Sequence, residues 1–394
     1  MKWEYKTLDQ LGTVSRGKSK HRPRNDPKLF GGKYPFIQTA DVKNADYYIT
    51  KYSDTYNESG LAQSKLWDKG TLCITIAANI ADTGVLAFPA CFPDSIMGFV
   101  PFEGVANTRF IKYCFDRLQR DCKQISQGTA QDNLSWEKLS TIKFCIPEYK
   151  EQCRIADILS AYDDLIENNQ KQIKLLEEAA QRLYKEWFVD LRFPGHENTK
   201  IVDGVPEGWS KSTVGNICKL RKVVITPDKI ESNTPYIGLE HMPRNDICLS
   251  TWGKSEEINS NKFIYLKKDV LFGKIRPYFH KVGFALNDGI TSTDTMVMVA
   301  DQNLWGLLLV TVSSDAFVDF SYQNCKEGAK MPRADWKQME KYAIMIADQA
   351  TQKLFEQEIL VITNKISALA FQCRSLREAR DRMLPKLMGG EVEA

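Results

Sequence analysis

The sequence lacks any run of about 18 consecutive apolar residues, the length that a helix needs to cross a membrane. Its first residues, MKWEYKTLDQLG, also lack the apolar stretch of a secretory signal. We therefore expect a cytoplasmic protein with no membrane partner. In that reducing compartment, its ten cysteines should remain free thiols.

Metal-binding and catalytic motifs are also missing. The cysteines form no C-x-x-C pair, and the four histidines stand in no metal-ligand spacing such as H-E-x-x-H. There is no nucleophile elbow, and the absence of any Pro-Pro pair excludes the Asn/Asp-Pro-Pro-aromatic motif of adenine methyltransferases. The sequence therefore predicts a chain with no catalytic residues, no metal site and no cofactor of its own.

The chain also has almost no excess of one charge, because its 53 Lys and Arg are nearly balanced by 50 Asp and Glu, which leaves a net charge of +3. A protein that coats polyanions over its whole surface would be more basic, so binding to nucleic acid would have to come from local patches. Material for packed cores is abundant, with 43% hydrophobic and 11% aromatic residues. A chain of 394 residues with this composition is typical of two or three globular domains.

The sequence repeats itself at a spacing of about 200 residues, which fixes much of the architecture. Three pairs of segments carry the repeat: YPFI at 34–37 with TPYI at 234–237, KGTL at 69–72 with KDVL at 268–271, and EAAQR at 178–182 with EARDR at 378–382. The chain therefore consists of two diverged copies of one unit. We expect 34–37 and 236–237 to be framework strands.

Each copy ends in a long segment whose apolar residues recur at alternating steps of four and three, the heptad pattern of packed helices. The pattern has one strongly polar position in each helix, Asn169 and Arg380, either of which could fix the register. Pro385 should end or kink the second helix near its last turn. The seam residues expected to hold the helix pair together are Leu159, Ile166, Asn169, Ile173, Leu176, Leu183, Ile359, Ile366, Leu369, Leu376 and Met383.

The rest of each copy mixes helix and sheet, with segments such as 263–266, 295–299 and 305–312 that are typical of strands or buried apolar runs. Two helices that leave different copies can bury their seams on each other only if they run antiparallel. The sequence thus predicts an α+β fold with a pseudo-twofold repeat, in which two mixed domains lie at opposite ends of two long antiparallel helices. The expected parts are a first domain at 1–146, a first spacer helix at 147–192, a linker and second domain at 193–346, and a second spacer helix with the C-terminal tail at 347–394.

Residues 12–19, GTVSRGKS, fit the phosphate-binding pattern G-x-x-x-x-G-K-[ST]. Such a loop needs a buried strand before it and the first turn of a helix after it. Here residues 4–11 are largely polar, and KHRPRNDP at 20–27 cannot begin a helix. We therefore interpret 12–19 as part of a basic surface loop. The alternative, a nucleotide-dependent enzyme, predicts ATP binding by the isolated chain.

Basic, turn-rich segments occur in both copies: RGKSKHRPRND at 16–26, then KIRPYFHK at 274–281 and the nearby Arg333. Arg and Lys neutralise phosphates, Arg can hold guanine, and Asn or Gln can pair with adenine. Solvated surface explains any one such loop, but their presence in both copies favours DNA contact. The residues that we expect near DNA are Lys18, Lys20, Arg22, Arg24, Asn25, Lys274, Arg276, Tyr278 and Arg333.

On this repeated framework, four segments appear in a specific order: LYKEWFVD at 183–190, VPEGW at 205–209, LFGKIRPY at 271–278 and LPKLMGGE at 384–391. With them the sequence resembles, over essentially its whole length, the specificity subunits of type I restriction-modification systems. The resemblance implies two target-recognition domains that each read one half of a split sequence in double-stranded DNA. It also implies a helix pair that sets the gap between the halves and docks two modification subunits.

The same resemblance assigns the chemistry to partners. It implies modification subunits that carry S-adenosylmethionine and methylate adenine, and motor-nuclease subunits that use ATP and Mg to cut DNA. This chain would then be non-catalytic. The main alternative is an interaction scaffold whose basic loops are incidental, and that class predicts no sequence preference on DNA.

Overall fold

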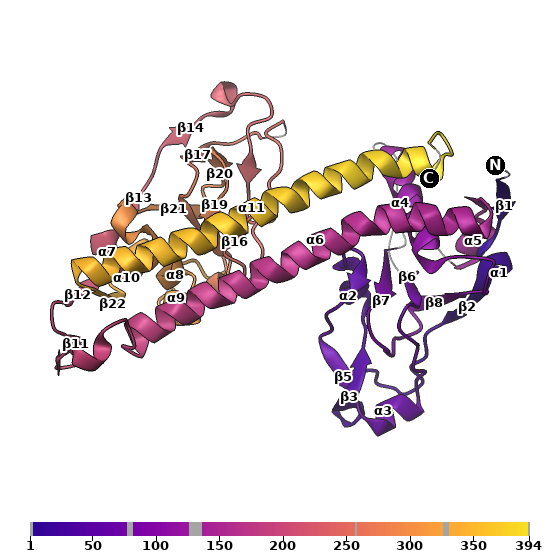
Figure 1. Cartoon of the computed structure of the whole chain (residues 1–394), viewed down its shortest axis with the longest axis horizontal. Coiled ribbons are helices and arrows are strands. Elements are labelled where there is room, and N and C mark those ends of the chain that lie inside the picture. Colours follow the sequence, from indigo (N-terminus) through magenta and orange to yellow (C-terminus); the bar gives the residue numbers. More distant parts are fainter. Residues whose placement is uncertain (1–2, 77–81, 126–135, 257, 326–330, 393–394) are drawn as a thin grey trace. The chain divides into compact units, whose positions relative to one another are not determined.

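The computed structural model describes residues 3–76, 82–125, 136–256, 258–325 and 331–392 (Figure 1). The chain folds into two compact units. Unit 1 comprises Met1–Leu165 with Leu376–Ala394, and unit 2 comprises Ile166–Ser375. Each unit contains one sheet domain and a section of both long helices. The predicted junctions at 146 and 346 fall on the last residues of the strands that precede these helices.

A five-stranded sheet forms the centre of unit 1, in the order β2, β8, β6, β7, β4, and only the β4–β7 pair is parallel. The strands are β2 (Gly12–Arg16), β8 (Ile96–Pro101), β6 (Leu72–Thr75), β7 (Thr83–Leu86) and β4 (Tyr48–Ile49). Along β6, Leu72 and Ile74 pack in one core, whereas Cys73 packs in a second core that contains Trp67. Alternate side chains thus enter cores on opposite faces, because a strand has a two-residue period.

The main sheet of unit 2 has the same plan, in the order β13, β21, β18, β19, β16, again with one parallel pair at the end. The strands are β13 (Lys219–Leu220), β21 (Thr295–Val299), β18 (Val270–Gly273), β19 (Val282–Ala285) and β16 (Cys248–Leu249). Each unit also pairs a strand near the start of its sheet domain with the strand before its long helix: β1 (Glu4–Lys6) with β9 (Phe144–Ile146), and β12 (Ser210–Thr213) with β22 (Ala343–Ile346). The matching order and directions confirm the internal repeat.

Smaller sheets complete the units and carry the expected framework strands. Unit 1 pairs β3 (Phe30–Phe36) with β5 (Asp54–Tyr56), and Phe36 also forms a parallel bridge to Cys91. Unit 2 has a four-stranded sheet in the order β14 (Val224–Ile225), β17 (Lys262–Tyr265), β20 (Gly289–Thr291), β15 (Tyr236–Ile237). A hairpin of β10 (Ile201–Val202) and β11 (Val205–Pro206) lies in the linker. The segments at 34–36 and 236–237 are therefore strands, as predicted.

Residues 305–312, expected to be a strand or a buried apolar run, are buried but form helix α8 (Trp305–Val312). All eight residues are buried, so the segment has no polar face whose spacing could distinguish a helix from a strand. Besides α8 and the two long helices, the α-helices in the described residues are α1 (Leu8–Leu11), α2 (Thr39–Lys43), α3 (Glu58–Ala62), α4 (Thr108–Ile125), α5 (Trp136–Thr141), α7 (Val214–Ile217), α9 (Asp315–Gln323) and α10 (Trp336–Met339).

Two long helices, α6 (Tyr149–Tyr184) and α11 (Gln349–Met388), follow the sheet domains as predicted, and a π-helical turn at Lys185–Val189 extends α6 (Figure 1). Within unit 2, Cys373 contacts the backbone of Ile166 and the ring of Trp187 contacts Phe355, so the two helices run antiparallel. Pro385 lies inside the last turn of α11, where its carbonyl accepts the N–H of Gly389. Helix α11 continues for three residues after Pro385 and ends at Met388, so the proline lies near the helix end as predicted.

The predicted seam residues differ in burial. The fully buried ones are Leu159, Ile166, Asn169, Ile359, Ile366 and Leu369, and the partly buried ones are Ile173, Leu176, Leu183, Leu376 and Met383. The two polar positions of the seam make different contacts. In unit 2 the amide of Asn169 donates to Gln372 at 3.4 Å, and in unit 1 Arg380 forms an ion pair with the buried Asp163.

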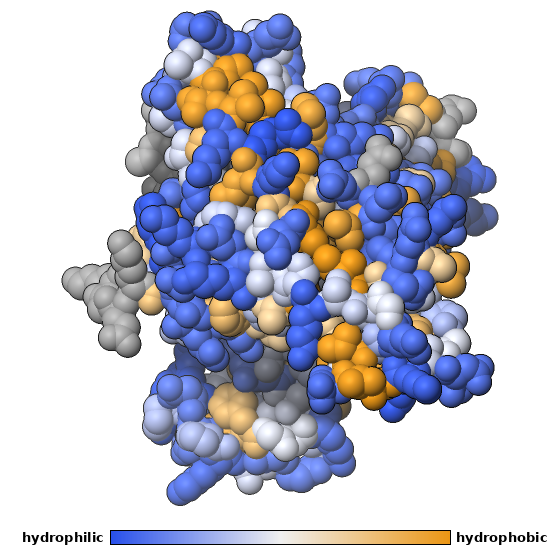
Figure 2. Space-filling view, turned by 90° about the vertical axis from the view of Figure 1, so that its left-hand side faces the viewer, coloured by the Kyte–Doolittle hydropathy of each residue, from blue (hydrophilic) through white to orange (hydrophobic). Residues whose placement is uncertain are grey.

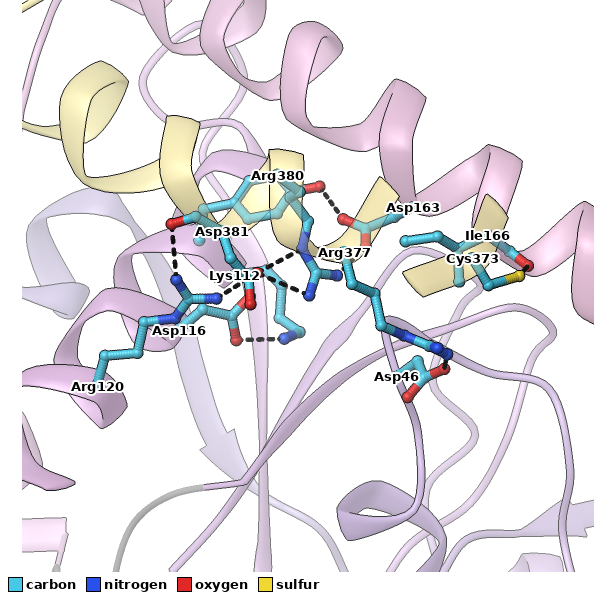
Figure 3. Close-up of polar contacts among 11 residues, drawn as sticks. Asp46, Lys112, Asp116, Arg120, Asp163, Ile166, Cys373, Arg377, Arg380 and Asp381 are labelled. Atoms are coloured by element: carbon cyan, nitrogen blue, oxygen red, sulfur yellow. Dashed lines mark hydrogen bonds and ion pairs between the residues drawn. The ribbon is translucent and has the colours of Figure 1, made fainter. Parts of the chain in front are cut away.

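The Arg380–Asp163 pair connects three helices of unit 1 (Figure 3). The other oxygen of Asp163, on α6, accepts a 2.5 Å hydrogen bond from the hydroxyl of Tyr113, on α4. Arg380 of α11 also donates to its neighbour Asp381, which pairs with Arg120 of α4. Burial lowers the pKa of Arg380, but these carboxylates raise it above its ordinary value overall. Burial likewise raises the pKa of Asp163, and the charge of Arg380 opposes that rise. The contacts themselves join α4, α6 and α11.

Two buried carboxylates on the long helices serve unit 2. Glu356 of α11 accepts the N–H groups of Gly306 and Leu307 at 2.6 and 3.0 Å, which would otherwise be unpaired at the start of α8. Glu177 of α6 accepts the N–H groups of Ile247 and Cys248 at 2.8 and 3.1 Å. Each carboxylate therefore fixes a long helix to the sheet domain of the same unit.

Breaking the buried ion pair of unit 1 should destabilise the protein strongly. Arg380→Met leaves Asp163 charged and buried, and we expect the free energy of unfolding to fall by about 3–5 kcal/mol in a denaturant titration. The double variant Asp163→Leu with Arg380→Met should regain most of this loss. As a control, Arg382→Met removes an exposed arginine that lies 3.7 Å from Glu378, and it should cost less than about 1 kcal/mol. A loss in Arg380→Met no larger than in this control would contradict the role of the pair.

The buried Glu177 should make unit 2 less stable at alkaline pH. Burial, followed by the negative charge of Asp246, raises the pKa of Glu177 from 4.5 to about 7, against the opposing effect of the two N–H donors. Because the folded pKa is the higher one, the stabilisation is fully present below pH 4.5 and is lost as pH rises through about 7. Relative to Glu177→Gln, the wild-type protein should lose up to about 3 kcal/mol of unfolding free energy between pH 5 and 8. Parallel pH profiles for the two proteins would exclude this effect.

Candidate nucleic-acid interface

The phosphate-loop pattern at 12–19 is not a nucleotide site. Residues 12–16 form strand β2, which pairs with β8, and the next helical segment is a short 3-10 turn at Pro27–Leu29. At Gly17 the chain passes so close to the backbone of Phe92 that a Cβ atom would lie 2.3 Å from its carbonyl oxygen. The N–H of Lys18 donates to that same carbonyl rather than to a phosphate cradle. The interpretation of 12–19 as surface loop is therefore wrong for residues 12–16, and the basic loop begins directly after this strand.

The loop after β2 in unit 1 exposes all five residues that we expected near DNA, namely Lys18, Lys20, Arg22, Arg24 and Asn25. Two of them already have partners. Arg22 donates to the carbonyls of Ser19 and His21, and one terminal nitrogen of Arg24 lies 2.7 and 2.8 Å from the two oxygens of Asp94. An exposed pair of this kind contributes little stability, so a phosphate can replace Asp94 at low cost.

Unit 2 brings its four expected residues onto two neighbouring segments. Ile275 forms an antiparallel bridge with Arg333, and the N–H of Arg276 donates to the carbonyl of Pro332 at 2.8 Å. Lys274 accepts the N–H of Ala334 through its own carbonyl. The segment that contains Lys274, Arg276 and Tyr278 is therefore fixed beside Arg333 by the backbone itself, and its side chains belong to one surface.

The charges on this surface lie close together. Burial lowers the pKa of Lys274, and the nearby Arg333 and Lys222 lower it further, while Asp294 opposes them. The ammonium of Lys274 donates to the carbonyl of Thr293 at 2.7 Å, so this lysine also supports the local backbone. Asp294 accepts from Arg333 at 3.0 Å. As in unit 1, one carboxylate occupies part of a basic surface that an incoming phosphate could take over.

The turn at 276–280 has an unusual backbone. Arg276 and His280 both adopt left-handed φ values, of 50° and 51°, on either side of the 3-10 turn Pro277–Phe279. Residues other than glycine rarely adopt this conformation, and such strain is concentrated at functional sites. It leaves the side chain of Tyr278 46% exposed, with its ring 5.2 Å from that of Tyr322. An exposed aromatic ring beside an arginine is suited to contacts with bases and sugars.

Sequence analysis missed one residue of this surface, Arg244. Its guanidinium lies 4.0 Å from the centre of the Phe279 ring, and that of Arg276 lies 5.7 Å from the same ring. Lys281, the last residue of the basic segment 274–281, is close to Arg244: burial is the main cause that lowers the pKa of Lys281, and the positive charge of Arg244 lowers it further. Neither contact has a local sequence signal, because the sheet brings the 244 turn and the 279 turn together.

Other kinds of site have no support in the described parts of the chain. Within those ranges, no group of three His, Cys, Asp or Glu side chains is placed to hold a metal ion. The helices that the structure describes include none with the length and apolar character needed to span a membrane. The two basic surfaces are therefore the candidate functional sites.

Comparison with known proteins finds relatives of one kind. Residues 1–178 match a family model described as the type I restriction modification DNA specificity domain. The chain is 25% identical to the type I restriction enzyme MjaIX specificity subunit of Methanocaldococcus jannaschii, over 99% of this chain and 93% of the relative. It is 20% identical to the type I restriction enzyme EcoDI specificity subunit of Escherichia coli, over 86% of this chain and 76% of that protein.

A solved structure has the same fold. The crystal structure of the type I restriction-modification system S subunit from M. genitalium aligns with this chain with a TM-score of 0.58 and 16% sequence identity. The alignment covers 98% of this chain and 96% of the M. genitalium chain. The family model, the full-length relatives and the repeated fold with long helices all agree. Residues 1–178 therefore match the DNA specificity domain of type I restriction-modification systems, and over nearly its whole length the chain is similar to the specificity subunits of such systems.

Proposed function

We propose that this chain selects the DNA target of a type I restriction-modification complex, with each unit reading one half of a split sequence. The observation that carries the proposal is the repeat. Two sheets of identical strand order support different basic surfaces, one in the loop that contains Lys18–Asn25 and one around Arg276 and Arg333. One framework with two unlike surfaces suits the reading of two unlike half-sites.

Each surface offers both kinds of contact that DNA recognition needs. Lysines and arginines can neutralise phosphates and so place the protein on the duplex, whereas Arg276 and Asn25 have side chains that can bind base edges. The small net charge of +3 agrees with this local arrangement. Because the chain acts on host DNA, we also propose that it works in the cytoplasm.

The long helices are proposed to set the gap between the half-sites and to dock two modification subunits. Apolar side chains on them remain exposed in unit 2, with 65% of Leu175 and 67% of Val361 accessible. A shallow groove of about 240 Å³ on α6 is lined by three apolar and three charged residues, Leu175, Ala179 and Leu183 with Glu178, Arg182 and Glu186. Figure 2 shows hydrophobic groups among hydrophilic ones on one face of the molecule. Exposed apolar groups on paired helices are typical of a surface that another subunit covers.

Catalysis is proposed to lie with the partner subunits. S-adenosylmethionine is assigned to the modification subunits, and ATP and Mg to the motor-nuclease subunits that join through the same complex. This division is supported by the family model that residues 1–178 match and by a sequence without a methyltransferase motif. The chain itself then contributes target choice and geometry.

The proposal can be tested by mapping methylation. The chain should be co-expressed with the modification subunit of its own system in a host free of DNA methylation, and methylated bases mapped by single-molecule sequencing. We expect a motif of two short defined parts with a fixed gap. A single undivided motif would show that only one unit reads DNA. A soluble complex without methylation would instead favour the scaffold alternative.

Replacing Arg276 should affect one half-site only. In the complex, Arg276→Ala should weaken binding to the methylation target by about tenfold and relax the sequence preference in the half read by unit 2. Lys341→Ala is the control, because it removes a positive charge elsewhere in unit 2 and interrupts only a 3.3 Å contact with Gln338. Fluorescence anisotropy with targets altered in either half separates the two effects. Unchanged affinity and preference in Arg276→Ala would remove this residue from the site.

A further inference from the structure

Helix α6 grips the turn that leads into the edge strand β16 of unit 2. The side chain of Glu177 is 4% exposed, and one of its oxygens accepts the N–H groups of Ile247 and Cys248. One turn earlier on the helix, the ammonium of Lys174 donates to the carbonyl of Asn245 at 3.0 Å. Two successive turns of α6 therefore hold the backbone of residues 245–248, which we call the grip turn.

The grip turn also supports residues 276–280, the segment with left-handed φ values at both ends. The N–H of Asn245 donates to the carbonyl of His280 at 3.1 Å, and Asn245 itself has a left-handed φ of 60°. Arg244, directly before the turn, places its guanidinium on the ring of Phe279. A continuous series of contacts thus runs from α6 through the grip turn to the residues that flank Tyr278.

The repeat shows that this grip is a regular feature of the fold. Position 377 on α11 corresponds to position 177 on α6, and Arg377 donates to the carboxylate of Asp46 at 2.9 Å (Figure 3). Asp46 corresponds to Asp246 and precedes β4, the counterpart of β16. The chemistry is reversed, with a cation on the helix of unit 1 and an anion on the helix of unit 2. Both copies nevertheless use the same helix position to hold the same part of the sheet.

We propose that Glu177 and Lys174 are positioning residues for DNA recognition by unit 2, so that α6 fixes the placement of Arg244, Arg276 and Tyr278 on the half-site. The inference rests on the proposed function of this surface. Base recognition depends on hydrogen-bond geometry that tolerates displacements of only about half an ångström. A helix that holds the supporting turn by three hydrogen bonds therefore contributes to specificity without touching DNA.

The test uses the complex of the full chain with its modification subunit and compares Glu177→Met with Glu177→Gln. Met has a similar volume but accepts no hydrogen bond, whereas Gln keeps one side-chain oxygen for the two N–H groups. We expect Glu177→Met to lose about tenfold in discrimination against substitutions in the half-site read by unit 2, with the other half read as before. Glu177→Gln should stay within about threefold of the wild type.

The matched control on the same helix is Glu167→Gln, which removes a partly exposed pair with Lys171 and should leave both half-sites unchanged. If Glu177→Met fails to fold, Lys174→Met tests the same turn, because Lys174 is exposed and its loss removes only the hydrogen bond to the carbonyl of Asn245 and the 3.5 Å contact with Asp246. Normal discrimination at both half-sites in the folded variant would overturn the inference. Failure of the proposed function is recognised separately, because the wild-type complex itself would then show no split motif.

Discussion

The core of unit 1 contains residues from both long helices: the beginning of α6 and the end of α11. The rest of the structure depends on this constraint. Leu384, Leu387 and Met388 of α11 pack in the same core as Ile155 of α6 and Phe110 of α4. Burial of such side chains contributes about 1.5–3 kcal/mol each, so the first sheet domain is incomplete without the end of the second long helix. The buried ion pair of Arg380 then selects one register among those that the apolar seam alone would permit.

Features that depend on local spacing could be predicted from the sequence. The heptad steps gave both helices and the buried positions Leu159 and Ile366, and the echoed segments gave the repeat that the strand orders confirm. The uniformly apolar 305–312 could not be assigned, because a segment buried on all sides has no periodicity. The contacts of Arg244 with Phe279 and of Glu177 with Ile247 join residues distant in sequence. No sequence pattern predicts which turns a sheet will bring together, so these two contacts could not be predicted.

Both proposed DNA surfaces contain a carboxylate among their cations. Asp94 pairs with Arg24 in unit 1, and Asp294 pairs with Arg333 in unit 2. In the free protein these acids lower the local positive potential and hold the arginines in place. A phosphate must then compete with a carboxylate for each arginine, which reduces indiscriminate attraction to any DNA backbone and leaves base contacts a larger share of the binding energy. The near-neutral net charge of the chain has the same effect.

The shared core also sets an order for biosynthesis. A ribosome releases the sheet of unit 1 first, yet the residues that close its core, Leu384 to Met388, leave the exit tunnel only after all of unit 2. Unit 2, which spans Ile166–Ser375, can close before them. The domain made first therefore finishes folding after unit 2, and any chain that stops before Leu384 exposes an open core that quality-control proteases can recognise.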